Sequence, residues 1–335
     1  MENLNVGVVG AGRIGKIHIE NIEKIDGVTV KTVADPFAGE LKEWFETTKA
    51  EKLTDSHEDI LNDEDINVLF ICSPTDTHIP LINAAAEKGM HVFCEKPISF
   101  SHEETLETYK LITEKNIKVQ IGFNRRFDKS FAKVKNLVEE NRLGDVHVVK
   151  ITSRDPEPPT LDYVERSGGI FFDMTIHDFD MARYLASSDV TEIYAQGGAL
   201  VNPDIAKHND IDTAIITLKY ENGAHGVIDN SREAVYGYDQ RIEVFGSKGN
   251  AMVSNETETK VKLFERESVS EDNPLHFFLE RYMDAFYVEV SDFFTAIKED
   301  KDVSPSFEDG MKAQQLAFAA KESYETGKPV KIEKL

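Results

Sequence analysis

The feature that most constrains this chain is an apolar run near its start that breaks into three closely spaced glycines. Residues 6–9 lead into Gly-Ala-Gly-Arg-Ile-Gly at 10–15. This pattern is typical of a buried strand, a tight turn and the first turn of a helix, where a pyrophosphate approaches the backbone and the helix N-terminus. The sequence therefore predicts a dinucleotide-binding turn. Glycine-rich turns without a nucleotide are the alternative.

A second apolar strand, at residues 28–34, ends at Asp35 and strengthens this prediction. An acidic residue about 20 positions after the last glycine accepts hydrogen bonds from the adenosine ribose in such folds. Its charge would repel the 2′-phosphate of NADP, and residues 36–39 contain no arginine to neutralise that phosphate. We therefore predict NAD as the cofactor.

Strands and helices alternate as far as residue 123. Apolar runs at 68–72, 91–94 and 118–122 have the length of strands buried on both faces of a parallel sheet. A helix follows the capping-box pattern of Ser101 and Glu104. We predict that residues 1–123 form an NAD-binding Rossmann domain with a doubly wound parallel sheet.

From residue 124 the pattern changes to strands joined mainly by turns. We expect one helix near 172–185 and two near 277–297 and 307–325. Strands are expected at 146–153, 192–199, 213–220, 224–230, 241–246, 251–254 and 260–265. Residues 124–335 are thus predicted to form a substrate-binding and oligomerisation domain. Its α+β fold would have a large, mainly antiparallel open sheet, with helices on one face and the other face free for subunit association.

Length and charge limit the class of protein. The 335 residues exceed the usual size of a single core. The formal net charge of −23 repels nucleic acid and anionic membranes. No window holds 18 consecutive apolar residues, and no basic and apolar leader precedes the first strand. We expect a cytoplasmic protein that binds neither nucleic acid nor membranes.

The two cysteines, Cys72 and Cys94, both follow or end apolar strands. We interpret them as buried, reduced thiols rather than as a disulfide. The sequence has no CxxC or HExxH spacing, so no metal site is predicted.

Asp173 and His177 are the strongest candidates for proton transfer. On one continuous helix, residues four positions apart are neighbours on the same face. A carboxylate beside an imidazole raises the basicity of the ring and orients it, as a general base for an alcohol proton requires. We predict this role for His177, with Asp173 as its support. A surface ion pair is the alternative.

Lys96 is the second candidate, because it follows a predicted strand at the edge where cofactors bind. Its ammonium could donate to a substrate hydroxyl and lower the pKa of that hydroxyl, or it could be a solvated lysine paired with Glu95. Arg125 and Arg126 could reach the cleft or pair with surface acids. The polar loops at 154–159 and 236–241 are equally compatible with a substrate wall and with ordinary loops.

Together these motifs resemble those of the Gfo/Idh/MocA oxidoreductases over essentially the whole chain. The resemblance rests on residues 10–15, Glu-Lys-Pro at 95–97, and residues 122–128, 168–185 and 228–241. Two stretches, at 173–183 and 236–241, are similar to the branch of the family that oxidises inositol at its 2-hydroxyl.

The resemblance implies NAD-dependent oxidation of myo-inositol to 2-keto-myo-inositol (scyllo-inosose) by a homotetramer. It implies that His177 takes the hydroxyl proton, Asp173 supports His177 and holds the polyol, and Lys96 binds the reacting oxygen. Further substrate contacts are implied for Arg126, Asp155 and Tyr236. The implied cofactor-binding residues are Gly10, Gly12, Arg13, Ile14, Gly15, Asp35, Ser73, Thr75, His78, Glu95 and Lys96.

Three alternatives stay open at this point. The chain could oxidise another polyol or sugar, such as scyllo-inositol or an aldose. It could also be a non-catalytic NAD-sensing protein, because fold does not determine function. The presence of Lys96, Asp173 and His177 together favours an enzyme. A metal-dependent sugar dehydrogenase is the least favoured, because the sequence has no ligand cluster.

Overall fold

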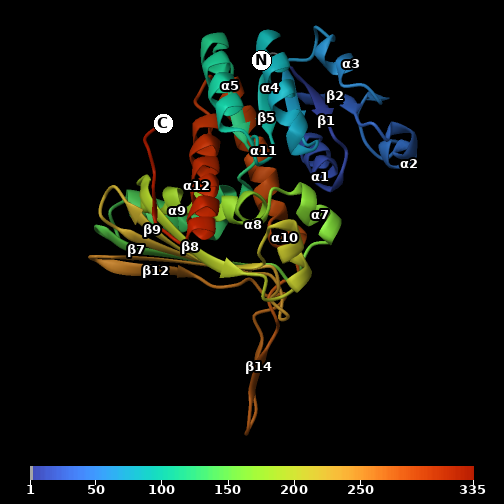
Figure 1. The fold of residues 1–335 in the computed structure, drawn as a ribbon. Coiled ribbons are helices and arrows are strands. Elements are labelled where there is room, and N and C mark those ends of the chain that lie inside the picture. Colours follow the sequence, from blue (N-terminus) through green and yellow to red (C-terminus); the bar gives the residue numbers. More distant parts are fainter. Residues whose placement is uncertain (1–2) are drawn as a thin grey trace. The chain divides into compact units, whose positions relative to one another are not determined.

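The computed structural model describes residues 3–335, and the chain divides into two compact units (Figure 1). Unit 1 comprises Met1–Phe127 and Asp284–Lys312, and unit 2 comprises Asp128–Met283 and Ala313–Leu335. The chain first passes from unit 1 to unit 2 after Phe127, close to the expected domain boundary at 123–124. The segment 284–312 differs from the expectation, because it was assigned to the second domain and belongs to unit 1.

Unit 1 contains a six-stranded parallel sheet in the order β3-β2-β1-β4-β5-β6, which confirms the predicted doubly wound fold. Its strands are β1 (Leu4–Val9), β2 (Val28–Ala34), β3 (Lys52–Thr54), β4 (Val68–Ile71), β5 (His91–Cys94) and β6 (Val119–Ile121). Its helices are α1 (Arg13–Ile22), α2 (Lys42–Phe45), α3 (Glu58–Leu61), α4 (His78–Glu87), α5 (His102–Lys115) and α11 (Met283–Lys298).

Helices cover both faces of this sheet. The connection through α1 runs from β1 to β2, and the connection through α4 runs from β4 to β5 in the opposite direction. Because both crossovers are right-handed, α1 and α4 lie on opposite faces. Helix α5 packs beside α4 (Figure 1).

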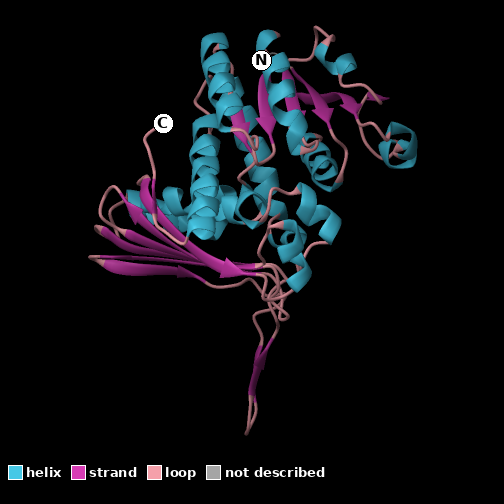
Figure 2. Cartoon of the chain, viewed as in Figure 1, coloured by secondary structure: helices cyan, strands magenta, loops and turns pink. Residues whose placement is uncertain are grey.

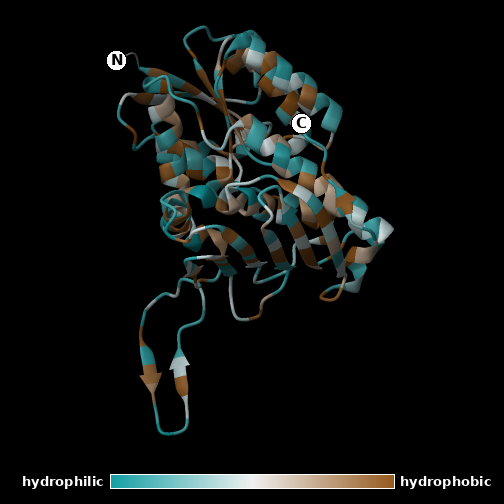
Figure 3. Cartoon of the chain, turned by 90° about the vertical axis from the view of Figure 1, so that its left-hand side faces the viewer, coloured by the Kyte–Doolittle hydropathy of each residue, from teal (hydrophilic) through white to brown (hydrophobic). Residues whose placement is uncertain are grey.

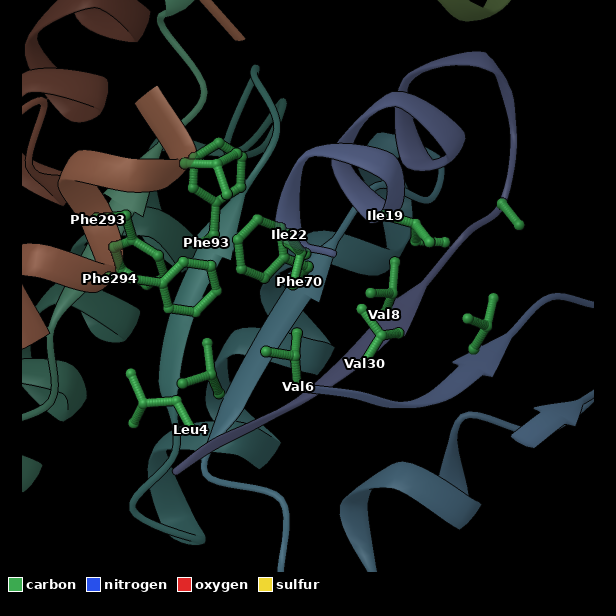
Figure 4. Close-up of a cluster of buried hydrophobic side chains, with 14 residues drawn as sticks. Leu4, Val6, Val8, Ile19, Ile22, Val30, Phe70, Phe93, Phe293 and Phe294 are labelled. Atoms are coloured by element: carbon green, nitrogen blue, oxygen red, sulfur yellow. The ribbon is translucent and has the colours of Figure 1, made fainter. Parts of the chain in front are cut away.

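The segment 284–312 joins unit 1 because α11 completes its core (Figure 4). Phe293 and Phe294 of α11 lie against Phe70 of β4, with ring centroids 5.8 and 5.7 Å away. Phe70 stacks in turn on Phe93 of β5 at 4.7 Å. The apolar face of α11 is thus buried against the parallel sheet, a partner that its amphipathic sequence does not specify.

Unit 2 contains a seven-stranded sheet in the order β12-β11-β7-β10-β9-β8-β15. Strand β10 pairs with β7 in parallel and the neighbouring pairs are antiparallel, which confirms the predicted mainly antiparallel sheet. The strands are β7 (Val146–Arg154), β8 (Val190–Gly198), β9 (Thr213–Tyr220), β10 (His225–Ser231), β11 (Asp239–Gly246), β12 (Gly249–Val253) and β15 (Val330–Lys331). The helices are α6 (Lys129–Glu139), α7 (Leu161–Arg166), α8 (Ile170–Asp173), α9 (Thr175–Ala186), α10 (Phe278–Arg281) and α12 (Phe307–Thr326), which begins in unit 1.

The two faces of this sheet differ. Helix α9 packs on β7 and β10, and helices lie along one side of the strands (Figure 2). Side chains on β9 alternate between buried and exposed, as expected when one face of a sheet is covered. Ile215, Phe245 and Met252 are exposed on the other face, which we call the open face. Within residues 3–335, no helix combines the length and the apolar character needed to cross a membrane.

The strand expected at 260–265 is not part of the large sheet. Residues Lys262–Phe264 form β13, which pairs only with β14 (Val269–Glu271) in a separate hairpin. The hairpin extends away from the sheet as a narrow ribbon with apolar segments near its strands (Figure 3). Val261, Leu263, Phe264 and Val269 are exposed there. An isolated two-stranded hairpin of this kind is marginally stable in water.

Candidate active site

The glycine turn after β1 has the geometry predicted for it. Gly10 has φ +92°, and a Cβ there would lie 2.7 Å from the carbonyl carbon of Cys72. A Cβ at Gly15 would lie 2.0 Å from the carbonyl oxygen of Gly10. Gly12, by contrast, faces open space, with nothing within 4 Å of a Cβ. The turn thus needs glycine at 10 and 15 for its own packing, and Gly12 leaves room for a phosphate.

The N-terminus of α1 fits the same ligand. Within residues 3–335, no side chain caps this helix at Gly12, and its first turn, which includes Arg13 and Ile14, contains no acidic residue. The first N–H groups of the helix and the positive end of its dipole are therefore available to an anion. These features suit the pyrophosphate of NAD.

Asp35 at the end of β2 is fixed beside the turn. Its Oδ2 accepts a hydrogen bond from the N–H of Ala11 at 2.8 Å, and its Oδ1 accepts one from Phe37 at 2.9 Å. Each carboxylate oxygen can accept a further hydrogen bond. The carboxylate is thus held beside the turn. Its binding to ribose hydroxyls stays a prediction.

His78 joins the loops that follow β4 and β5. Its Nδ1 lies 2.8 Å from the carbonyl oxygen of Pro97, and its Nε2 lies 2.9 Å from that of Ser73. The ring is buried, and burial lowers the pKa of His78. The side chain therefore lies between two loops, one of which contains Thr75. His78 is predicted to bind the cofactor, and its effect on the cofactor would be exerted through the positions of these loops.

Lys96 lies two residues after the end of β5 and is partly buried. Its neighbour Glu95 has a partner that sequence reasoning missed. The Oε1 of Glu95 lies 2.7 Å from Nε2 of His18, a buried side chain of α1. The available signal was a histidine three positions after the last glycine, on the face of α1 that packs on the sheet.

Arg126, predicted to contact substrate, is buried in unit 1. Its guanidinium binds both carboxylate oxygens of Asp309, at 3.1 and 3.2 Å, and donates to Oγ of Ser304 at 3.2 Å. This arrangement links the residues after β6 to the start of α12. A substrate contact by Arg126 stays a prediction.

In unit 2 the prediction of a single helix near 172–185 is wrong. The segment is divided at Met174 into α8, which ends at Asp173, and α9, which begins at Thr175. The N–H of His177 bonds to the carbonyl of Met174 at 3.3 Å. Asp173 and His177 are therefore on consecutive helices, each with its own anchor.

Asp173 is anchored by two donors. Its Oδ2 accepts a hydrogen bond from Nη1 of Arg232 at 3.0 Å, and its Oδ1 accepts one from the hydroxyl of Tyr163 at 2.8 Å. Arg232 is 1% exposed, and its Nη2 lies 3.9 Å from Oδ2 of Asp210. The charge of Asp155 acts on both Arg232 and Tyr163. We call these five residues the Asp173 cluster.

Burial and charge shape this cluster further. Burial and the charge of Asp173 raise the pKa of the Tyr163 hydroxyl, so it stays a donor. Burial also raises the pKa of Asp210. The cluster thus offers hydroxyl and guanidinium donors beside carboxylate acceptors, which is the mixture that binds neighbouring hydroxyls of a polyol.

Asn230 of β10 anchors the first turn of α9, on both sides of His177. Its Oδ1 accepts from Oγ1 of Thr175 at 2.7 Å, and its Nδ2 donates to Oδ2 of Asp178 at 2.8 Å. All three anchoring side chains are buried. The contacts of Asn230 with α9 and of Arg232 with Asp173 were not predicted from the sequence. The available signal was Asn230 and Arg232, two polar residues that continue the alternation of the buried Ile228 at the end of β10.

Tyr236 lies in a different group, on the open face. Its hydroxyl donates to Oδ2 of Asp239 at 2.6 Å and accepts from Nη1 of Arg154 at 3.2 Å. Arg154 also pairs with Asp229, and Arg241 pairs with Asp239 at 2.7 Å. We call these five residues the open-face cluster. Arg154 and Asp229 alternate with the buried Ser153 and Asn230, so they point away from α9. The structure therefore brings Asp155 and Asp173 together but does not bring Tyr236 to them.

The thiols of Cys72 and Cys94 are both free, and burial raises the pKa of each. Cys94 is buried as predicted, whereas Cys72, which follows β4, is partly exposed as a residue. In the part of the chain that the structure describes, no three His, Cys, Asp or Glu side chains gather so that they could hold a metal ion.

Comparison with known proteins agrees with this geometry. Residues 4–123 match the family described as "Oxidoreductase family, NAD-binding Rossmann fold", and residues 131–252 match the GFO/IDH/MocA C-terminal domain. An uncharacterised oxidoreductase of Bacillus subtilis (strain 168) is 50% identical, over 98% of this chain and 96% of its own. The myo-inositol 2-dehydrogenase of Thermotoga maritima is 44% identical, over 99% of each chain. The scyllo-inositol dehydrogenase of Lactobacillus casei, solved with NAD(H) and scyllo-inositol, has a TM-score of 0.91 at 30% identity and 99% coverage of each chain. These matches confirm the resemblance and NAD as the cofactor.

Proposed function

Because the chain belongs to the GFO/IDH/MocA oxidoreductases, we propose that it oxidises myo-inositol to 2-keto-myo-inositol (scyllo-inosose) with NAD. The Asp173 cluster is the observation that carries this proposal. Its carboxylates, hydroxyl and buried guanidinium match the alternating donors and acceptors of a polyol. The 44% identical relative named myo-inositol 2-dehydrogenase supports this substrate.

In the proposed mechanism His177 removes the proton of the reacting hydroxyl as general base. When bound, NAD supplies the acceptor for the hydride that leaves the substrate carbon. Lys96 donates a hydrogen bond to the reacting oxygen and stabilises the charge that develops there. Asp173, held by Arg232 and Tyr163, accepts hydrogen bonds from substrate hydroxyls. The protein thus positions the reactants and moves the proton, and the cofactor carries the redox chemistry.

The residues around the glycine turn hold the cofactor in this proposal. Gly10, Gly12 and Gly15 admit the pyrophosphate to the N-terminus of α1, and Asp35 binds the adenosine ribose. The loops containing Ser73, Thr75 and His78, and the Glu95-Lys96 segment, would line the nicotinamide half. Asp35→Ser should relax the discrimination against NADP. Unchanged affinities for both NAD and NADP would show that Asp35 does not contact the ribose.

The deciding experiment is a panel of polyols and sugars with NAD and with NADP, followed by the absorbance of the reduced cofactor. We expect turnover of myo-inositol with NAD. His177→Ala should lower kcat by about 10²- to 10⁴-fold, the usual contribution of a general base, while NAD binding is retained. Unchanged turnover in this variant would show that His177 is not the general base.

The same panel addresses the other substrates. The Lactobacillus casei structure supports scyllo-inositol as the second candidate, because that enzyme has this fold at 30% identity and binds scyllo-inositol. The two inositols differ in whether the reacting hydroxyl is axial or equatorial, so the same residues would meet it from a different direction. If scyllo-inositol or an aldose has a higher kcat/KM than myo-inositol, that compound would be assigned as the substrate instead. NAD binding without turnover of any of these compounds would favour a non-catalytic sensor.

We further propose that the protein is a homotetramer. The open face presents exposed apolar side chains, among them Phe245 and Met252, and the hairpin presents Leu263 and Phe264. Contiguous exposed apolar surface is typical of association sites. Sedimentation velocity at micromolar concentration should give about four times the mass of the chain, and a monomer would refute this assembly. The free thiols Cys72 and Cys94 support a reducing compartment, the cytoplasm, which cell fractionation would test.

A further inference from the structure

A buried histidine connects the helix at the glycine turn to the strand edge that bears Lys96. His18 of α1 is 0% exposed, and its Nε2 lies 2.7 Å from Oε1 of Glu95, the residue before Lys96. The imidazole is packed edge-on against Phe70, Phe93 and Phe286, with ring centroids 5.8, 4.9 and 5.9 Å away. Three aromatic neighbours leave the ring little freedom, so it holds the Glu95 carboxylate in one position.

Gly122 forms another wall of this carboxylate site. It follows β6, the strand next to β5, and a Cβ at Gly122 would lie 2.9 Å from Cδ of Glu95. The obstructing group is the flexible end of a side chain, so a methyl group at 122 would push Glu95 aside rather than disrupt the backbone. The carboxylate is therefore confined between α1 and the end of β6.

Stability alone does not account for a polar pair in this place. Removing an imidazole and a carboxylate from water is costly, and apolar side chains of similar volume often serve a core equally well or better. Phe70 and Phe93 already make the surroundings apolar. The pair is therefore better explained by the position it imposes on Glu95 than by a gain in folding free energy.

We propose that His18 is a positioning residue that acts on Lys96 through Glu95. His18 lies on α1, the helix that begins at the glycine turn, so the pyrophosphate site and the Lys96 segment are held as one body. This inference rests on the proposed role of Lys96 at the reacting oxygen. In such sites a misplacement of about 1 Å can cost about 10² in rate.

Two substitutions of His18 separate its hydrogen bond from its volume. His18→Phe keeps an aromatic ring and removes the donor, whereas His18→Gln keeps an N–H near the position of Nε2. We expect His18→Phe to lower kcat by about 10- to 100-fold. The KM for NAD should change by less than about threefold, because the glycine turn is intact. His18→Gln should restore most of kcat.

Gly122→Ala disturbs the same carboxylate with His18 intact. It should lower kcat by a similar factor, and the double variant with His18→Phe should be no worse than the more severe single variant, because both act through Glu95. Ile22→Val is the matched control: it trims a buried side chain of the same helix that belongs to the apolar core, and it should leave kcat unchanged. Equal kcat in His18→Phe and Ile22→Val would overturn the proposal.

A second readout separates this inference from the proposed function. Reductive methylation of Lys96, measured by mass spectrometry with and without NADH, reports where its amine lies relative to the cofactor. NADH should protect Lys96 in the native protein and in Ile22→Val but not in His18→Phe. This result would support the positioning role even if no polyol were oxidised. Equal protection in all three proteins would refute it, even if myo-inositol were a good substrate.

Discussion

Two polar clusters on opposite faces of the seven-stranded sheet differ in their balance of charge. The Asp173 cluster combines three carboxylates with one guanidinium, whereas the open-face cluster combines two of each. Their charged members are Asp155, Asp173, Asp210 and Arg232 on one face, and Arg154, Asp229, Asp239 and Arg241 on the other. Where each carboxylate is balanced by a guanidinium group, as on the open face, no ligand is needed to balance the charge. Surplus carboxylates still have acceptor sites for hydroxyl groups, so the Asp173 cluster suits substrate binding and the open-face cluster suits structure.

The clusters also differ in how their arginines are solvated. Arg232 is 1% exposed, whereas the side chains of Arg154 and Arg241 are 30% and 47% exposed. A buried guanidinium that loses its partner remains out of water, while an exposed one regains hydration. The same kind of substitution should therefore have different costs on the two faces.

The largest effect is expected for Asp173→Ala. This change leaves Arg232 buried without its closest carboxylate, so the free energy of unfolding should fall by about 3–5 kcal/mol. Turnover should fall by at least about 10²-fold if Asp173 binds the polyol and supports the base. Urea unfolding and formation of reduced cofactor measure the two effects. Asp173→Asn keeps an acceptor and should recover stability but not turnover; recovery of both would weaken the contrast between the faces.

Asp239→Ala is the corresponding test of the open face. Asp239 is buried and accepts hydrogen bonds from Arg241, Tyr236 and Asn255, so its removal should cost about 1–3 kcal/mol in unfolding free energy. Turnover should stay within about threefold of the native value, because the change lies away from the Asp173 cluster.

The matched control for Asp239→Ala is Glu243→Ala on the same strand and face, whose pairing with Lys150 is more exposed and should contribute at most about 1 kcal/mol. A fall in turnover of more than about tenfold in Asp239→Ala alone would support the predicted substrate contact of Tyr236. It would also break the assignment of the open-face cluster to structure.

Tyr163→Phe sharpens the comparison within the Asp173 cluster. It removes one donor to Asp173 and leaves Arg232 in place. The loss of one hydrogen bond of about 1 kcal/mol corresponds to a decrease in kcat/KM of about fivefold. The thermal midpoint should change little, because Tyr163 is 47% exposed as a whole, although its hydroxyl is buried, and Arg232 still anchors Asp173. A thermal shift without a kinetic effect would make the tyrosine a structural anchor only.

Sequence reasoning succeeded where a pattern is local. The glycine turn, the apolar run of β4 and the capping box at Ser101, whose Oγ accepts from the N–H of Glu104 at 3.3 Å, are each defined within a few residues. Their physical requirements, a positive φ, a buried strand or a capped helix end, act on neighbouring residues. They can therefore be recognised without knowledge of the fold.

Contacts between distant residues could not be predicted in the same way. Arg232 and Asp173 are 59 positions apart, and His18 and Glu95 are 77 apart. The helices on either side of Met174 are anchored by distant residues: Arg232 lies 59 positions from Asp173, and Asn230 lies 55 positions from Thr175. The assignment of α11 to unit 1 likewise depends on the partner of its apolar face. Periodicity shows that a face is buried but not what covers it.

The smallest expected effect is a pH dependence confined to the open face. Burial alone would raise the pKa of Asp239, but hydrogen bonds from Arg241, Tyr236 and Asn255 outweigh it, and the pKa lies below its ordinary value of 3.8. A lowered pKa in the folded state adds stability that is present above the unfolded-state pKa and is lost as the pH falls through the folded-state value. The advantage of the native protein over Asp239→Asn in urea midpoint should thus be constant near neutral pH and shrink below about pH 4. A gap that persists undiminished at lower pH would mean that the arginine pairs of Asp239 do not stabilise the fold, and the compensated cluster would lose its structural role.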